Sequence, residues 1–382
     1  MSVDQLADEI AEILGRYYAP GIEMQLSDES DRIRYTQHGD TLEALVAEVL
    51  GGVDEDDTVA SAIVRRLTYC SHRDRADGGE PRFQSQINYA RRALRPVEVE
   101  EKWLEFKSGI MHRSRFFNDH GKQFLDWLFR GIHSFRGFSY GDSDVVRILA
   151  ATDDVTIYRA RYCPPSYDYK KIVANPETEL AAPPKELAKA GRMNPVGVPV
   201  FYGAFDRDTC IAELRPSVGG MVLSGAFKLN LDTYVLDFGM LEDFYETEGL
   251  SYFDPNYRIN EERRQFLKML HSKISSAVVP GQEQEYLITQ VIAEYLSTQI
   301  DPKIDGVLFS SAQHENGQNI VFFSHALSAV PSELTPIRIE YIPGSLEAHS
   351  ISGVVFTKDP LWIHEGEIMK DENYDFHDEW DY

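Results

Sequence analysis

The sequence predicts an α+β protein in which a helical N-terminal part precedes a part rich in short strands. Over the first 140 residues, apolar side chains recur at the three- and four-residue spacing of amphipathic helices. From residue 152 onward the pattern changes to short β-like runs separated by Pro, Gly, Asp or Asn, and two helical segments interrupt them. Because helices and strands do not alternate strictly, the pattern favours α+β over a doubly wound α/β sheet.

Helices are expected in the N-terminal part over residues 2–18, 40–52, 58–70, 98–110 and 114–133. Ser2 or Asp4 is a candidate N-cap for the first helix and Asp40 for the second, because short polar side chains accept hydrogen bonds from free backbone N–H groups. Gly51 and Gly52 end the second helix. The last helix offers these side chains to a core: Phe116, Phe117, Phe124, Leu125, Trp127, Leu128 and Phe129.

The strand-rich part is expected to form a sheet from runs that are short and apolar. In order, these runs are VTIYRARY, PVFYGAF, MVLSGAFKLN, TYVLDF, DGVLFSS, NIVFFS, PIRIEYI and SGVVFT. The interrupting helices are expected at about 260–275 and about 283–300, where apolar residues again follow helical spacing.

A domain boundary is predicted within residues 135–152. It separates a helical unit, 1–140, from a strand-rich unit, 152–345, and residues 346–382 form a C-terminal strand and an acidic tail. The last twenty residues hold eight acidic residues and one lysine, a density of like charge that is typical of a solvated tail. The same tail carries four aromatic residues that leave docking open: Tyr374, Phe376, Trp380 and Tyr382.

Composition narrows the classes of function. The net charge of −24 repels phosphate backbones, so nucleic acid is not an expected partner. The N-terminus lacks a signal-peptide pattern and no apolar run reaches the length of a membrane span, so a cytoplasmic protein without a membrane partner is expected. Cys70, Cys163 and Cys210 form no CxxC pair, which indicates a reducing compartment. Cys70 and His72 alone are too few for a metal site, and no metal is expected.

Two segments offer cations that suit an anionic ligand. In the strand IYRAR, alternation places Arg159 and Arg161 on the same face, where they form either a clamp for a diphosphate or carboxylate or the charged surface of an edge strand. In GRMNPVG, Arg192 lies between Gly191 and Gly197, which allow close approach of the backbone to a ligand. Each pattern is weak when it is taken alone.

Three further positions add polar groups. Tyr202 lies on the strand PVFYGAF, where it packs in a core or stacks on a ligand ring. Glu213 lies in a short helix for which Asp208 is the candidate cap; it binds a ligand hydroxyl or forms a salt bridge to Arg207 or Arg215. The serines of DGVLFSS end a strand without a nucleophile elbow, which favours a hydrogen-bonding role over nucleophilic attack.

The order of these motifs resembles the RES domain, a family named for its Arg, Glu and Ser. The matching features are YR, GR-x-N, a strand Tyr, a Glu eleven residues later, and DG-x-x-x-x-S followed by N-x-x-x-F. They cover about residues 152–330. The N-terminal half is similar to the HEPN-like domain found before RES domains. Residue by residue, the resemblance assigns the family positions to Arg159, Arg192, Tyr202, Glu213 and Ser311.

The resemblance implies a fold similar to ADP-ribosyltransferases, with a split sheet, and an activity on NAD+. It implies a toxin that depletes NAD by hydrolysis or phosphorolysis, with NAD+ as substrate and no further cofactor. Glu213, Ser311 and Arg159 are the expected catalytic residues. Arg192 and Tyr202 are the expected substrate-binding residues, joined by Arg161, which has no sure family match.

Other functions remain open from the sequence. Protein ADP-ribosylation would use the same site, and a non-catalytic interaction module would need none of it. Arg115 and His120 fit the R-x4-H pattern of HEPN ribonucleases, although their helical spacing makes them only loosely convergent. An antitoxin or regulatory protein and a homo-oligomer are the candidate protein partners.

Overall fold

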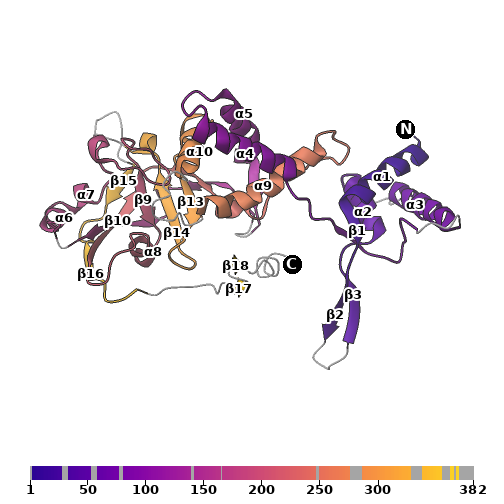
Figure 1. The fold of residues 1–382 in the computed structure, drawn as a ribbon, viewed down its shortest axis with the longest axis horizontal. Helices are drawn as coiled ribbons and strands as arrows, with labels where there is room; N and C mark the ends of the chain where they lie inside the picture. Colours follow the sequence, from indigo (N-terminus) through magenta and orange to yellow (C-terminus); the bar gives the residue numbers. More distant parts are fainter. Residues whose placement is uncertain are drawn as a thin grey trace.

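The computed structural model describes residues 2–27, 33–52, 58–76, 81–138, 142–164, 166–246, 249–275, 286–327, 338–354, 362–364 and 367–369. The chain has the predicted α+β fold, with N-terminal helices followed by a nine-stranded mixed sheet that further helices flank (Figure 1). The acidic tail from residue 370 lies outside the described residues, as do its four aromatic residues.

The first helices form where apolar spacing predicts them. Helix α1 (Val3–Tyr17) begins at Ser2, whose hydroxyl accepts the Gln5 N–H while the Gln5 side chain accepts the Ser2 N–H in return. Helices α2 (Leu42–Val49) and α3 (Thr58–Ala76) follow. Thr41, rather than the predicted Asp40, caps α2, because the Asp40 backbone is paired with Tyr89 in a β-bridge.

This part also contains strands that the sequence pattern does not predict. Strand β1 (Tyr18–Pro20) pairs with β4 (Tyr89–Arg91), and β2 (Glu23–Ser27) forms a hairpin with β3 (Ile33–Gln37). The strands of the first pair have three residues each, too few to show a period-two pattern in the sequence.

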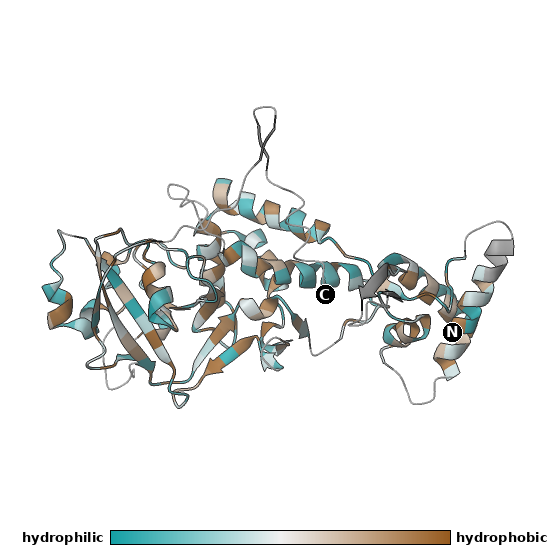
Figure 2. Cartoon of the chain, turned by 90° about the horizontal axis from the view of Figure 1, so that it is seen from below, coloured by the Kyte–Doolittle hydropathy of each residue, from teal (hydrophilic) through white to brown (hydrophobic). Residues whose placement is uncertain are grey.

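The N-terminal helices have a hydrophobic core of their own, and the chain after about residue 95 forms separate cores. Helices α1 to α3 share the N-terminal core, which Tyr257 joins at the start of α9. The largest of the other cores lies between the sheet and four helices: α4 (Val97–His112), α5 (Asp119–Leu128), α9 (Tyr257–Ser275) and α10 (Tyr286–Thr298). Figures 1 and 2 show the N-terminal helices as a group set apart from the rest of the chain. Helices α4 and α5 therefore belong to the core of the sheet, although they precede the boundary predicted at 135–152.

The sheet consists of two halves. One half comprises β8 (Thr156–Cys163), β10 (Met221–Leu229), β15 (Ile339–Tyr341) and β16 (Glu347–Ser350). The other comprises β9 (Phe201–Ala204), β14 (Gln318–Phe322), β13 (Gly306–Ser310), β11 (Thr233–Asp237) and β7 (Val146–Leu149). All pairs are antiparallel except that of β11 and β13. A single residue pair, Tyr158 with Ala204, joins β8 to β9, so the sheet is split at this point.

Smaller elements complete this part of the chain. A three-stranded sheet comprises β5 (Phe135–Gly137), β6 (Ser143–Asp144) and β12 (Phe244–Glu246). Short helices are α6 (Lys170–Ala174), α7 (Pro176–Glu179) and α8 (Arg207–Ala212). Strands β17 (Trp362–His364) and β18 (Glu367–Met369) form a hairpin. The run SGVVFT is not a strand in its described part; β16, just before it, pairs with β10 instead.

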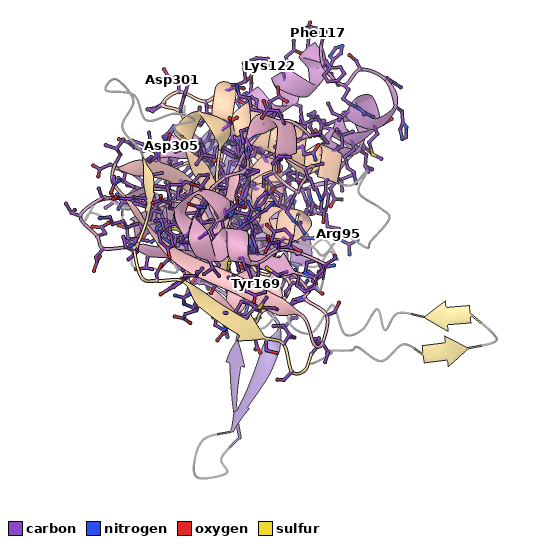
Figure 3. The ribbon with its side chains drawn as sticks, turned by 90° about the vertical axis from the view of Figure 1, so that its left-hand side faces the viewer. Arg95, Phe117, Lys122, Tyr169, Asp301 and Asp305 are labelled. Atoms are coloured by element: carbon purple, nitrogen blue, oxygen red, sulfur yellow. The ribbon has the colours of Figure 1, made fainter. Side chains whose placement is uncertain are left out.

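The prediction that Phe116 and Phe117 belong to a core is wrong. Both lie in the loop before α5, with 88% and 94% of their surface exposed. Asn118 caps α5, and the Ser114 hydroxyl donates to the Phe117 carbonyl, so the loop turns outward before the helix begins. Figure 3 shows Phe117 at the outer edge of the molecule. Within the described part of the chain, no helix has both the length and the apolarity of a membrane span.

Candidate active site

A cavity of about 500 Å³ opens where the sheet splits. Its walls come from β8, β9, β13 and β14, from α8 and the turn after it, and from the start of α10. The charged side chains that line it are Arg159, Arg192, Glu213 and Arg215. Segments up to 160 residues apart in the sequence therefore line one small space, and its charged side chains come from residues 159–215.

Glu213 stands directly after α8, at the cavity wall. Asp206, rather than the predicted Asp208, caps this helix, and its carboxylate accepts the Thr209 N–H at 2.7 Å. The Glu213 Oε1 atom accepts two hydrogen bonds, from the Ser311 hydroxyl at 2.6 Å and from the Asn319 amide at 2.7 Å. Both bonds from the described residues fall on the same oxygen, which leaves Oε2 for a ligand.

Ser311 orients that carboxylate. It follows the last residue of β13, and its Oγ accepts the N–H groups of Gln313 and His314, each at 3.1 Å, while it donates to Glu213. Neither of the two arginines predicted as alternative partners, Arg207 and Arg215, forms an ion pair with Glu213 among the described residues; Arg207 pairs instead with Glu347 at 3.0 Å. The structure thus assigns Ser311 a positioning contact, as its place at a strand end predicts.

Arg159 is a half-buried cation that forms no ion pair with the residues that the structure describes. Its guanidinium lies 4.8 Å from the centre of the Phe201 ring, and its Nη1 is shielded from solvent and has no hydrogen-bond partner among the described residues. Burial, aided by the nearby charge of Arg161, lowers the pKa of Arg159 to about 10, so it remains a cation at neutral pH. Arg161 lies two residues further along β8 and does not line this cavity, so its role in substrate binding stays a prediction.

Arg192 reaches the cavity from the loop before β9. Its guanidinium lies 5.6 Å from the centre of the Tyr286 ring and donates a hydrogen bond to the Ile274 carbonyl. Helix α10 fixes the loop, because the Thr289 hydroxyl donates to the Arg192 carbonyl. Burial lowers the pKa of Arg192, and the negative charge of Glu213 acts in the opposite direction.

Tyr202 shapes the same loop from β9. Its hydroxyl accepts the Met193 N–H at 2.8 Å and donates to the Asn194 side chain at 2.9 Å, while its ring lines the cavity. Burial raises the pKa of Tyr202, so the phenol stays protonated and acts as a structural donor. The hydroxyl therefore holds the Arg192 loop, and only the ring is left to meet a ligand.

Gly191 is required for this contact. A Cβ at residue 191 would lie 2.6 Å from the Tyr202 hydroxyl and 2.8 Å from the Asn194 side-chain oxygen. We expect Gly191→Ala to displace the loop and to destabilise the protein by about 1–3 kcal/mol, measured as a lower midpoint of chemical denaturation. Gly249→Ala is the matched control, because a Cβ there meets no atom within 4 Å. Equal midpoints for the two variants would contradict the packing role.

Eight lining residues were not predicted as site residues, and four of them carry polar or ionisable side chains. The sequence could have indicated Asn319, since it is the Asn of the N-x-x-x-F strand. No sequence pattern indicates Tyr286 as a site residue, because nothing in the sequence shows that α10 packs against the loop of Arg192. Arg215 was considered only as an ion-pair partner. Burial raises the pKa of Cys210 to about 12, so its thiol is protonated at neutral pH and is a poor nucleophile.

The charge of the cavity is opposite to that of the chain. Three guanidiniums and one carboxylate line it, a balance of +2 among the described residues, whereas the chain carries −24. A concave, partly buried site focuses such a local field and attracts anions. The arrangement suits a ligand that combines negative charge with hydroxyl groups and a ring.

The other motifs lie elsewhere. Arg115 is exposed in the loop between α4 and α5, and His120 is exposed in the first turn of α5, and neither lines the cavity. Cys70 lies in α3, and the side chain of His72 is outside the described residues. Among the residues that the structure describes, no three His, Cys, Asp or Glu side chains gather as a metal site would require.

The fold and the cavity define an α+β protein with a cationic small-molecule pocket in the split of its sheet. Residues 156–342 match the family model of the RES domain, so this part of the chain is a RES domain. That family is associated with NAD-related enzymatic activity. Searches of curated proteins and of solved structures found no match. The match begins after α5, so the likeness of the N-terminal half to HEPN-like domains stays a prediction.

Proposed function

We propose that the protein cleaves the bond between nicotinamide and ribose in NAD+. The observation that carries this proposal is the Glu213 carboxylate, held by Ser311 and Asn319 in the same cavity as the Arg159 guanidinium, which has no ion pair among the described residues. NAD+ offers a counterpart for each group: a diphosphate for arginine, ribose hydroxyls for the carboxylate, and a ring for tyrosine.

The chemistry needs a negative charge beside the ribose. As the bond from ribose C1 to the nicotinamide nitrogen breaks, its electron pair goes to that nitrogen, so nicotinamide leaves neutral and positive charge develops on the ribose. A carboxylate stabilises such an oxocarbenium-like transition state, as in glycoside cleavage. Oε1 of Glu213 is fixed by its two donors, which leaves Oε2 for the ribose hydroxyls. The acceptor then adds to C1 and loses its proton.

The arginines have a separate task. Arg159 and Arg192 hold the diphosphate through charge-assisted hydrogen bonds, each of which contributes about 1.5–3 kcal/mol. The Tyr202 and Tyr286 rings border the cavity and offer faces to nicotinamide. Substrate binding and bond cleavage thus depend on different side chains, which permits separate tests.

Products of the reaction identify both the bond and the acceptor. The purified protein is incubated with NAD+ with and without phosphate, and the products are identified by mass spectrometry. We expect nicotinamide together with ADP-ribose if water is the acceptor, or phosphorylated ADP-ribose if phosphate is. A mass increase of the protein itself would assign the acceptor to a side chain. Intact NAD+ in both reactions would refute the proposal.

A further inference from the structure

Arg215 has an unusual backbone for its residue type. Its φ is +45°, in the left-handed region, and Pro216 follows it. The other described non-glycine residues with positive φ are Asp142, Asp154 and Asn316, whose side-chain types tolerate this region well. Arginine does not share that tolerance, and a residue before proline favours extended backbone instead.

The place of Arg215 at the end of a helix explains its left-handed backbone, but it does not explain why the residue is an arginine. Arg215 ends the turn after α8, where its N–H donates to the Ala212 carbonyl at 2.9 Å. A left-handed residue after a helix is ordinarily glycine, sometimes asparagine, because it closes the helix without steric cost. Arginine here is therefore less favourable for folding than glycine, which implies that its side chain has a use.

The Arg215 side chain lines the cavity and remains accessible. It is exposed, and it forms no ion pair with the described residues. Arg215 and Arg192 line the same cavity, and the positive charge of Arg215 contributes to the lowered pKa of Arg192. Arg159 is half-buried with its Nη1 shielded from solvent, whereas Arg215 is exposed at the cavity wall.

We propose that Arg215 is a specificity-determining residue that binds the diphosphate of a dinucleotide together with Arg192. This inference rests on the proposed function and adds a residue that the ordered motifs do not include. Two guanidiniums that line one cavity match the two phosphates of a diphosphate, and an arginine fork binds phosphate oxygens with two hydrogen bonds. The cavity then distinguishes a dinucleotide from a nucleoside that lacks the diphosphate.

The test separates the side chain from its backbone. Arg215→Gly removes the charge and also relieves the left-handed conformation. We expect its melting temperature to rise by about 1–3 °C while KM for NAD+ and Kd for ADP-ribose rise about 10-fold, with kcat within about twofold. The loss of affinity should shrink at high salt, because the guanidinium is exposed. Nicotinamide riboside, which has no diphosphate, should be cleaved equally by both proteins.

Two controls isolate the causes. Asp154→Gly relieves a positive φ of +51° away from the cavity and should leave KM unchanged. Lys170→Ala removes an exposed positive charge outside the cavity and should also leave KM unchanged. Arg215→Lys keeps the charge without the fork and should fall between wild type and Arg215→Gly.

The outcomes distinguish this inference from the proposed function. Active wild-type protein with unchanged KM and Kd in Arg215→Gly would overturn the role of Arg215 alone. A lower melting temperature in Arg215→Gly with unchanged affinity would also overturn it, because the arginine would then be structural. A wild-type protein that neither cleaves NAD+ nor binds ADP-ribose would overturn both.

Discussion

Glu213→Gln is expected to slow nicotinamide release from NAD+ roughly 1,000-fold while leaving the fold intact. Glutamine keeps the side-chain shape and an oxygen that accepts the hydrogen bonds of Ser311 and Asn319. It lacks the negative charge that opposes the positive charge on the ribose in the transition state. The effect should therefore appear in kcat, measured by liquid chromatography of free nicotinamide, with little change in Kd for ADP-ribose.

Glu315→Gln is the matched control for that variant. Glu315 is exposed in the same loop as Ser311 and does not line the cavity. Its nicotinamide release should equal that of the wild type. If Glu213→Gln kept full activity, the carboxylate would have no part in bond cleavage and the site would need another origin for its chemistry.

Arg159→Met is expected to abolish tight binding and to stabilise the unliganded protein. Loss of the guanidinium should weaken ADP-ribose binding about 100-fold, measured by calorimetry, because a charge-assisted contact to the diphosphate is removed. Burial lowers the pKa of Arg159, which means that the charged form opposes folding. Methionine fills similar space without charge, so the melting temperature should rise by a few degrees even after the contact with Phe201 is weakened.

The lowered pKa of Arg159 also determines how stability and ligand affinity change with pH. The folded-state pKa of Arg159 is about 10, below its unfolded value, so the charged guanidinium destabilises the fold below that pH and this cost fades above it. Ligand affinity runs in the opposite direction, because the anion needs the cation. Affinity for ADP should be constant between about pH 7 and about pH 9 and should fall above about pH 10. In Arg159→Met this alkaline loss of affinity should disappear, and its persistence would contradict the role of Arg159.

Much of the architecture could be predicted from local patterns. Helices α1, α4, α9 and α10 lie where apolar residues recur at helical spacing, and the runs from VTIYRARY to PIRIEYI supply strands of the sheet. The hairpin of β2 and β3 could not be predicted from the pattern that marks the other strands. The placement of α4 and α5 on the sheet core also depends on long-range packing, which a helical pattern does not encode.

The residues of the candidate site could be predicted only where the order of the motifs along the chain indicated them. Arg159, Arg192, Tyr202, Glu213 and Ser311 were predicted as site residues; the first four line the cavity, and Ser311 contacts it through Glu213. Strand alternation also suggested Arg161, but β8 and β9 separate after one residue pair, and Arg161 lies outside the cavity. Gly191 is also required for packing, since Tyr202 occupies the space that its missing side chain leaves; that its backbone approaches a ligand stays a prediction.

A structure of the protein with a non-cleavable carbocyclic analogue of NAD+ tests the central claim most directly. We expect the analogue in the split of the sheet, with its nicotinamide-bearing ring beside Oε2 of Glu213. Its diphosphate should contact Arg159, Arg192 and Arg215. An analogue bound outside this cavity, or bound with adenine against Glu213, would contradict the account.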